Sequence, residues 1–209
     1  MKALIDLHYL PCIAYFAVIQ RFKTICLEKH EHFVKQSYRN RCYINTEHGK
    51  DVLVIPLTDK HGKVAVKDIR IDYTQKWVNN HWRSICSAYG KAPFFEYYAD
   101  DLESNLFKQH TFLYELNYEL LTMCLKWLKA DLRVEETLTY QQTFSDDTSN
   151  LRDCLSDRDE GKCKKLYRPM PYAQVFGNSF VENLSIVDLV FCCGPEAGRI
   201  VKASSAVED

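Results

Sequence analysis

Residues 31–42, which read EHFVKQSYRNRC, concentrate the side chains best suited to bind an anion. Three cations, Lys35, Arg39 and Arg41, stand here beside Asn40. Two guanidinium groups can hold a carboxylate or a phosphate through paired hydrogen bonds. A charged strand edge that resists pairing with other chains would explain the same residues without a ligand. We predict that the substrate-binding residues of this segment are Lys35, Arg39, Asn40 and Arg41.

The local conformation decides how these cations are presented. If residues 38–44 form a strand, Arg39 and Arg41 point to one face of it. If residues 35–39 instead form a turn of helix, Lys35 and Arg39 align and Arg41 points away. The sequence leaves both conformations open.

Histidine can supply the acid or base for chemistry at such a site, because its pKa lies near neutrality. His8 lies where a predicted strand ends and a helix begins, and His32 lies inside the cationic segment. We predict that one of the two is catalytic. The stretch HYLP lacks the second His and the Gly of the HxGH motif, so a buried structural histidine is the competing interpretation of His8.

Several aromatic side chains lie at the end of a predicted helix at residues 74–89 and just after it. Tyr89 and Phe94 are among them, and their rings could stack on a sugar or a base, although helix packing explains them equally well. His81 lies on a different face of this helix from Trp82 and could face a cleft or water. We predict substrate contacts from Tyr9, His81, Tyr89, Phe94 and Asp188.

Several familiar sites are missing from the sequence. Neither GxxxxGK[ST] nor GxGxxG occurs, which excludes a cofactor held by a glycine-rich phosphate loop. The nucleophile motif GxSxG is absent as well. His30 and His32 with a distant cysteine do not have the spacing of zinc ligands, so we predict no metal. The identity of any cofactor is left open.

The first thirty residues predict a βαβ unit. ALIDL and TICLE have the length and composition of short strands, and PCIAYFAVIQRF between them has helical spacing after Pro11. In such units ligands bind beyond the carboxyl ends of the parallel strands. The unit would therefore place residues 7–11 and 31–36 on the same rim.

The remaining chain divides into two parts. Short β-rich runs with turns at Gly49 and Gly62 predict an antiparallel element, and from residue 74 the periodicity is helical. Asn183 is predicted to cap a last helix that ends at Gly194. We predict an α/β or α+β fold in one domain, 1–209. It has a mixed sheet in 1–73, a mainly helical part in 74–197, a flexible loop in 143–165 and a frayed tail in 198–209.

Charge and cysteine content limit the partners and the compartment. The net charge is -1 and the pI is about 6.6, so no global field favours nucleic acid or an anionic membrane. Nine cysteines without a CxxC pair predict reduced thiols. No apolar run has the length of a membrane span, and Asp6 lies too early for a signal peptide. We predict a soluble, cytoplasmic protein, and the oligomeric state is left open.

Several stretches resemble, in their order along the chain, the WbqC-like bacterial proteins. They are LHYLPCIAYFA, EHFVKQSYRNRCYI, the HW followed by SAYGKAPFFEYYADDL, PYAQVF and NLSIVDLVFCCGPEA. The residues that match the family pattern are Tyr9, Pro11, Tyr15, Phe16, Lys35, Asn40, Arg41, Trp77, Tyr89, Pro93, Phe94, Leu184, Ser185, Asp188 and Gly194. The chain departs from the family at Leu7–His8, where Gln-Pro is common, and at Cys192–Cys193, where an Asn usually precedes the glycine.

The resemblance implies a transferase that adds an amino-acyl, glycine-like group or an acyl group to a sugar or sugar-nucleotide in surface polysaccharide synthesis. The cationic segment would then bind an anionic donor or a sugar-nucleotide phosphate. Independently of the resemblance, Asp188 lies on an apolar helix, where its charge needs a partner, and a salt bridge with Arg39 or Arg41 is one candidate. The alternative is a non-catalytic protein that binds an anionic metabolite or glycan precursor.

Overall fold

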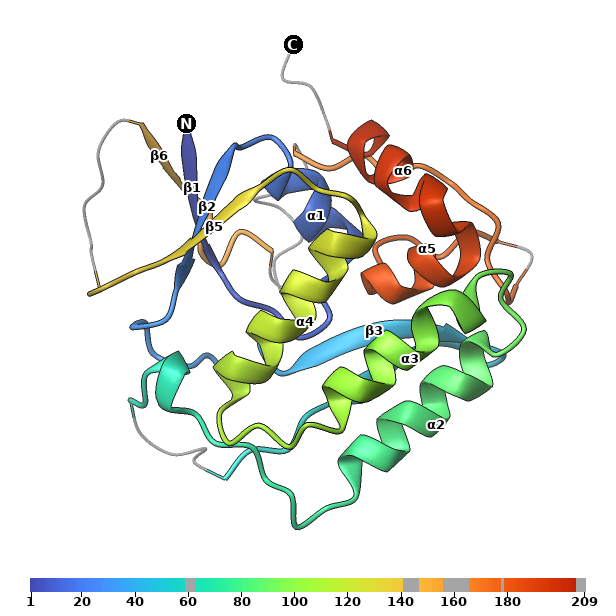
Figure 1. Cartoon of the computed structure of the whole chain (residues 1–209), viewed down its shortest axis with the longest axis horizontal. Helices are drawn as coiled ribbons and strands as arrows, with labels where there is room; N and C mark the ends of the chain where they lie inside the picture. Colours follow the sequence, from blue (N-terminus) through green and yellow to red (C-terminus); the bar gives the residue numbers. More distant parts are fainter. Residues whose placement is uncertain (59–62, 141–146, 156–165, 178, 206–209) are drawn as a thin grey trace.

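The structure, a computed structural model, describes residues 1–58, 63–140, 147–155, 166–177 and 179–205 (Figure 1). Its central element is a parallel sheet with the strand order β5-β2-β1-β6. The strands are β1 (Lys2–Asp6), β2 (Thr24–Glu28), β5 (Arg133–Glu136) and β6 (Thr148–Asn150). Buried, mainly apolar residues run through β1 and β2, as is typical of parallel strands covered on both faces.

The predicted βαβ unit is confirmed. Helix α1 (Ile13–Ile19) connects β1 to β2, and all of its residues are buried. Asp6 and Glu28 are paired in the register of the two strands, so both end at the same edge of the sheet. The amide N–H of Ala14, in the first turn of α1, donates to Asn183 Oδ1 at 3.0 Å. The N-cap residue of the helix that ends at Gly194, α5 (Ile186–Cys193), is Ser185, so the prediction of Asn183 at that position is wrong, and the Asn183 side chain accepts from the first turn of α1 instead.

The antiparallel element is a separate hairpin. Strands β3 (Arg41–Thr46) and β4 (Gly49–Val54) pair with each other and form a second sheet. Gly49 has a φ of 96° at the turn between them, as its prediction required. The parallel and antiparallel pairings that we predicted in one mixed sheet thus occur in two sheets. The turn predicted at Gly62 lies outside the described residues.

The mainly helical second half is confirmed. After the short 3-10 turn η1 (Val66–Asp68) come α2 (Trp77–Tyr89), α3 (Phe95–Leu106), α4 (Leu113–Trp127), α5 (Ile186–Cys193), the 3-10 turn η2 (Gly194–Glu196) and α6 (Ala197–Ala203). In Figure 1, α1 and α4 lie beside the sheet, with α5 and α6 to the right of α1. No helix among the described residues is long and apolar enough to cross a membrane.

Two short strands and the last helix differ from the prediction. β5 lies in the part predicted as helical, and β6 lies within the predicted loop 143–165. The loop residues 143–146 and 156–165 are outside the described part of the chain. Helix α6 covers residues 198–203, half of the tail that we predicted to be frayed, because its residues Ala197 and Val201 are buried against the core.

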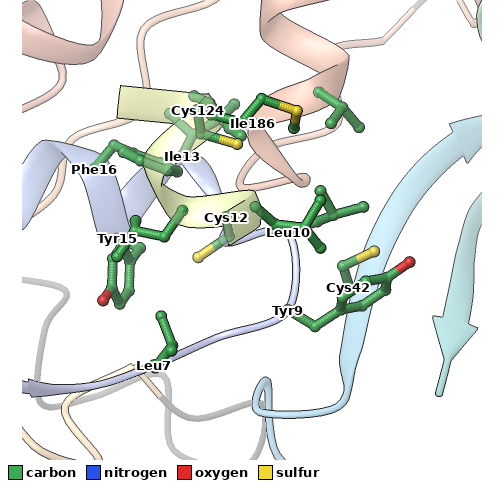
Figure 2. Close-up of a cluster of buried hydrophobic side chains, with 14 of the residues drawn as sticks. Leu7, Tyr9, Leu10, Cys12, Ile13, Tyr15, Phe16, Cys42, Cys124 and Ile186 are labelled. Carbon is green, nitrogen blue, oxygen red and sulfur yellow. The ribbon is translucent and has the colours of Figure 1, made fainter. Parts of the chain in front are cut away.

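The core forms where the β1–α1 connection, β3, α4 and α5 converge (Figure 2). Cys12, Cys42 and Cys124 are buried free thiols in this cluster, and burial raises the pKa of the Cys12 thiol to about 11. They act as small apolar side chains, as predicted. Cys154, in contrast, is disulfide-bonded, so the prediction of reduced thiols is wrong for this residue.

Replacement of Gly194 by alanine is expected to lower the free energy of unfolding by about 2–4 kcal/mol. Gly194 has a φ of 53°, and a Cβ there would lie 2.6 Å from Cγ of the Phe94 ring. Gly49→Ala is the matched control, since its φ of 96° is also positive but no heavy atom would lie within 4 Å of its Cβ. Urea denaturation measures both variants. Equal losses would show that the Phe94 contact contributes nothing beyond backbone strain.

Candidate functional site

The carboxyl edge of the parallel sheet gathers charged side chains. β1 ends at Asp6 and β2 at Glu28, and Asp153 follows β6 after a short turn. Relative to β1, the strands β2 and β5 lie on one side and β6 on the other. Open parallel sheets bind ligands at such a reversal of strand order, beyond the carboxyl ends of the strands. This edge is therefore the candidate site.

Arg39 lies at the centre of the cluster and is 1% exposed. Its Nη2 atom is 3.3 Å from Asp6 Oδ2 and 3.1 Å from Asp153 Oδ1. Its Nε atom donates to Glu31 Oε1 at 3.1 Å, and Nη2 contacts the same oxygen. Burial opposes its charge, but the surrounding carboxylates raise the pKa of Arg39 above its ordinary value. We call Asp6, His8, Glu31, Arg39 and Asp153 the carboxyl-edge cluster.

Backbone contacts hold Arg39 in place. Residues 35–40 form consecutive turns, with a φ of 56° at Gln36. The Nδ2 atom of Asn117, on α4, donates to the carbonyl oxygen of Arg39 at 2.7 Å. The Nδ2 atom of Asn40 donates to the carbonyl oxygen of Ile55 at 2.9 Å. Neither predicted conformation occurs, because the turns end before β3 begins at Arg41, so Arg39 and Arg41 do not share a strand face.

His8 is the buried histidine of the cluster, at 1% exposure. Its Nε2 atom lies 2.9 Å from Asp6 Oδ2, and its ring stacks on Tyr38 at a centroid distance of 5.4 Å. Burial opposes ionisation of Asp6, but His8 and Arg39 hold the pKa of this carboxyl well below its usual range. An ionised carboxylate only accepts hydrogen bonds. Nε2 is therefore the protonated nitrogen of His8, and its N–H donates a hydrogen bond to Asp6. Nδ1 has no hydrogen-bond partner among the described residues.

Glu31 is the member of the cluster with a pKa near neutrality. Burial raises its pKa to about 7, against the opposing effect of Arg39. Between its ordinary pKa of 4.5 and this value, the folded state binds more protons than the unfolded state. The ionisation of Glu31 therefore reduces the stability of the fold as the pH rises through this range.

Replacement of Glu31 by glutamine is expected to remove this pH dependence. From about pH 4.5 to pH 7, the free energy of unfolding of Glu31→Gln should rise relative to wild type by an amount on the order of 2 kcal/mol. Urea denaturation at several pH values measures the difference, with the exposed Glu47→Gln as control. A difference that does not change with pH would contradict the raised pKa of Glu31.

The other predicted residues of the cationic segment are more accessible to solvent than Arg39. Lys35 and His32 are exposed, and the backbone of His32 forms a bridge with Ala65. Arg41 is half-buried at the start of β3. The structure thus joins His8 and Arg39 through Asp6, while Lys35 and His32 are exposed.

Tyr9 and His81 form a separate buried pair. The hydroxyl group of Tyr9 is 3.0 Å from Nδ1 of His81, and Trp77 packs edge-on against the imidazole at 5.1 Å. Burial lowers the pKa of His81 to about 4, so this ring is neutral at neutral pH. His81 is 5% exposed. It therefore faces the protein interior, rather than the cleft or water that its position in the sequence suggested.

Asp188, on α5, anchors a second cluster. Its carboxylate accepts hydrogen bonds from Tyr89 Oη at 2.9 Å, Tyr172 Oη at 2.5 Å and Gln174 Nε2 at 3.3 Å. The predicted salt bridge with Arg39 is wrong, because Arg39 binds the carboxylates of the sheet edge. Gln174 also lines a groove of about 420 Å³ with Lys91, Pro93 and Cys192. Phe94 is half-buried and packs against Gly194 rather than standing open for a sugar.

Replacement of Asp188 by asparagine is expected to lower the free energy of unfolding by about 1.5–3 kcal/mol. The variant keeps the shape of the side chain but loses the negative charge to which the hydroxyl groups of Tyr89 and Tyr172 donate. Its amide NH₂ group also replaces one of the two acceptor oxygens, so one of these hydroxyls loses its acceptor. Urea denaturation measures the loss, and Asp131→Asn on the surface is the control. A stability equal to that of the control would show that Asp188 does not anchor the PYAQVF segment.

Sequence reasoning did not predict the three acids of the carboxyl-edge cluster, Asp6, Glu31 and Asp153, as site residues. Asp6 and Glu28 each end a predicted strand of the βαβ unit, which is a usable signal, because the carboxyl ends of parallel strands meet at one edge. Asp153 has no such signal, since it lies in the segment that we predicted as a loop. Among the described residues, no group of His, Cys, Asp and Glu is arranged to hold a metal ion.

Comparison with known proteins gives one match. The model of the WbqC-like protein family matches residues 7–160 and 162–200, which include His8, Arg39 and Asp188. No curated protein and no solved structure matches the chain significantly. The family match covers the carboxyl-edge cluster except Asp6, and it covers the helix that carries Asp188. The chain therefore belongs to the WbqC-like protein family.

Proposed function

We propose that this protein is a transferase that adds an acyl or amino-acyl group to a sugar or sugar-nucleotide, with His8 as the general base. The class of reaction comes from the resemblance described above. One observation supports the assignment of the base. Asp6 accepts a hydrogen bond from Nε2–H, and Nδ1 of the same buried ring has no hydrogen-bond partner among the described residues. An imidazole held in this way presents a lone pair in a fixed direction.

The proposed step is a proton transfer coupled to attack on a carbonyl group. Nδ1 of His8 takes the proton of the nucleophile, whose oxygen or nitrogen atom bonds to the acyl carbon while the bond to the leaving group breaks. The imidazolium then returns the proton to the leaving group. Asp6 stabilises the imidazolium, and Arg39 keeps Asp6 ionised for this purpose.

Access to His8 requires movement of its cover. The ring of Tyr38 stacks on the imidazole, and the amide N–H of Tyr9 donates to the carbonyl oxygen of Tyr38 at 2.9 Å. The preceding residues of this turn, Lys35 and Gln36, are exposed. In the proposal the turn shifts when substrate binds, and Lys35 contacts a phosphate of the donor.

An anion-binding role for Arg39 itself has less support. Its guanidinium group is engaged by three carboxylates, so a phosphate would have to displace one of them. The non-catalytic alternative, a protein that binds an anionic metabolite, depended on Lys35, Arg39 and Arg41, and it loses the support of Arg39.

A ligand and turnover screen tests the proposal. Sugar-nucleotides, acyl-CoAs and aminoacyl esters are first tested for stabilisation of the protein by thermal shift, since a ligand of the native state raises Tm. Stabilising donors and acceptors are then combined, and the acylated sugar is measured by mass spectrometry. We expect at least one pair to give product. Stabilising ligands that never give product would favour the non-catalytic alternative.

A further inference from the structure

The groove at the end of α5 shares no residue with the carboxyl-edge cluster. It is lined by Lys91 and Pro93 from the loop after α2, by residues 173–176 and by Cys192 of α5. Its volume of about 420 Å³ is within the range of roughly 300–1,000 Å³ that is usual for small-molecule sites. We call it the α5 groove.

Hydrogen bonds hold the segments that line the α5 groove. The amide N–H of Phe94 donates to the carbonyl oxygen of Phe191 at 3.0 Å, which ties the loop after α2 to α5. The Nδ2 atom of Asn45, on β3, donates to the carbonyl oxygen of Phe176 at 3.1 Å. The groove is therefore formed by segments that are already fixed, and a preformed site loses less conformational entropy when it binds a ligand.

Most of the lining is apolar. The side chains of Pro93, Ala173, Val175 and Phe176 present carbon atoms only. The thiol of Cys192 adds no charge, because burial raises the pKa of this thiol well above its ordinary value. These side chains offer a ligand hydrophobic contact rather than hydrogen bonds.

Lys91 is the one charged side chain that lines the groove. It is exposed, and it forms no hydrogen bond or ion pair with the described residues. The amide of Gln174 is already bonded at both ends, because its Nε2 and Oε1 atoms each bond to the backbone of Val181 at 2.9 Å. A sugar or a nucleotide needs several hydrogen-bond partners, and these side chains leave it only Lys91.

The buried charge of Asp188 fixes the direction in which an anion would enter. Its carboxylate lies 3.3 Å from Nε2 of Gln174, behind the lining of the groove. A second negative charge deep in the groove would be repelled, whereas one beside the exposed Lys91 would be attracted. The ligand should therefore carry its charge at the Lys91 end and its apolar part at the other.

We propose that the α5 groove binds an aliphatic monocarboxylate, with its carboxylate at Lys91 and its hydrocarbon chain along residues 173–176. One carboxylate matches one ammonium group, and the chain removes apolar surface from water. The proposal goes beyond the function proposed above and does not rest on it, since His8 takes no part.

A series of straight-chain acids tests the site on the full chain. Butyrate, hexanoate and octanoate are the probes, measured by isothermal titration and by thermal shift at low salt. We expect the dissociation constant to fall about three- to fourfold for each added methylene group, the contribution of one buried CH₂. Hexylammonium should not bind, because its charge has the sign of Lys91. Failure of all three acids to bind, or an affinity that does not rise with chain length, would overturn the inference without any variant.

Replacement of Lys91 by glutamine tests the charge. It should weaken the binding of hexanoate about fivefold, the upper contribution of an exposed ion pair, and leave the binding of 1-hexanol unchanged. Lys202→Gln, at an exposed cation of α6, is the matched control and should bind hexanoate like wild type. Hexanoate binding of wild-type strength in Lys91→Gln would show that the carboxylate lies elsewhere.

Replacement of Ala173 by tryptophan tests the groove itself. Ala173 is exposed, so the larger ring should fill the groove without unfolding the protein, and both hexanoate and 1-hexanol should lose binding. Ala203→Trp, at the exposed end of α6, is the control for the added ring. Octanoate that binds Ala173→Trp as tightly as wild type would overturn the assignment to this groove.

Discussion

Replacement of His8 by glutamine is expected to lower kcat for acyl transfer about 10²–10⁴-fold, the usual contribution of a general base. The glutamine amide can still donate a hydrogen bond to Asp6 in place of Nε2. It has no lone pair on nitrogen and cannot take a proton from the nucleophile. Because the side chain remains polar and of similar reach, the fold should persist while catalysis is lost.

The measurement is the steady-state rate of product formation with the donor and acceptor found in the screen, together with the Tm of each variant. His48→Gln is the matched control, since the side chain of His48 is 88% exposed in the β3–β4 turn. This control should turn over like wild type. A folded His8→Gln variant with the wild-type kcat would show that His8 is not the base.

Replacement of Arg39 by methionine is expected to lower the free energy of unfolding by about 3–5 kcal/mol, the cost of removing one partner from a buried ionic group. Methionine fills a similar volume but leaves Asp6, Glu31 and Asp153 without their common cation. The carbonyl group of residue 39 can still accept from Asn117, so the loss reports the side chain.

The sign of the pH effect separates this cause from a packing defect. Without Arg39 the pKa values of the Asp6 and Glu31 carboxyls rise, so the folded variant prefers their protonated forms. Its deficit relative to wild type should therefore shrink as the pH falls toward 4. Lys35→Met, at an exposed cation of the same segment, is the control for urea denaturation. A deficit independent of pH would mean that Arg39 matters through its volume rather than its charge.

The two clusters have different consequences for function. In the carboxyl-edge cluster, Nδ1 of His8 has no hydrogen-bond partner within the described part of the chain, and three carboxylates contact Arg39. The cluster at Asp188 satisfies its carboxylate with hydroxyl and amide donors from Tyr89, Tyr172 and Gln174. The first is suited to chemistry, whereas the second holds the chain together.

The sequence by itself determined the elements that have strong local signals. β1, β2 and α1 are apolar and buried almost throughout, and α4 lies in the part whose periodicity is helical, which is why these local signals were informative. The parallel pairing of β1 and β2 followed from the short helical crossover. It predicted residues 7–11 and 31–36 on one rim, and Arg39 contacts both Asp6, at the end of β1, and Glu31.

Only the tertiary structure decided which polar groups are partners. β5 and β6 are short and partly exposed, and they are strands because they pair with β2 and β1 rather than by their own propensity. Arg39 was predicted to bind an external anion, but carboxylates from β1, the 31–38 segment and the residues after β6 already contact it. Ion pairs between residues distant in sequence depend on the register of the sheet and on burial. Neither is encoded in a local pattern, so the sequence identified Arg39 and His8 but could not show that Asp6 holds them together.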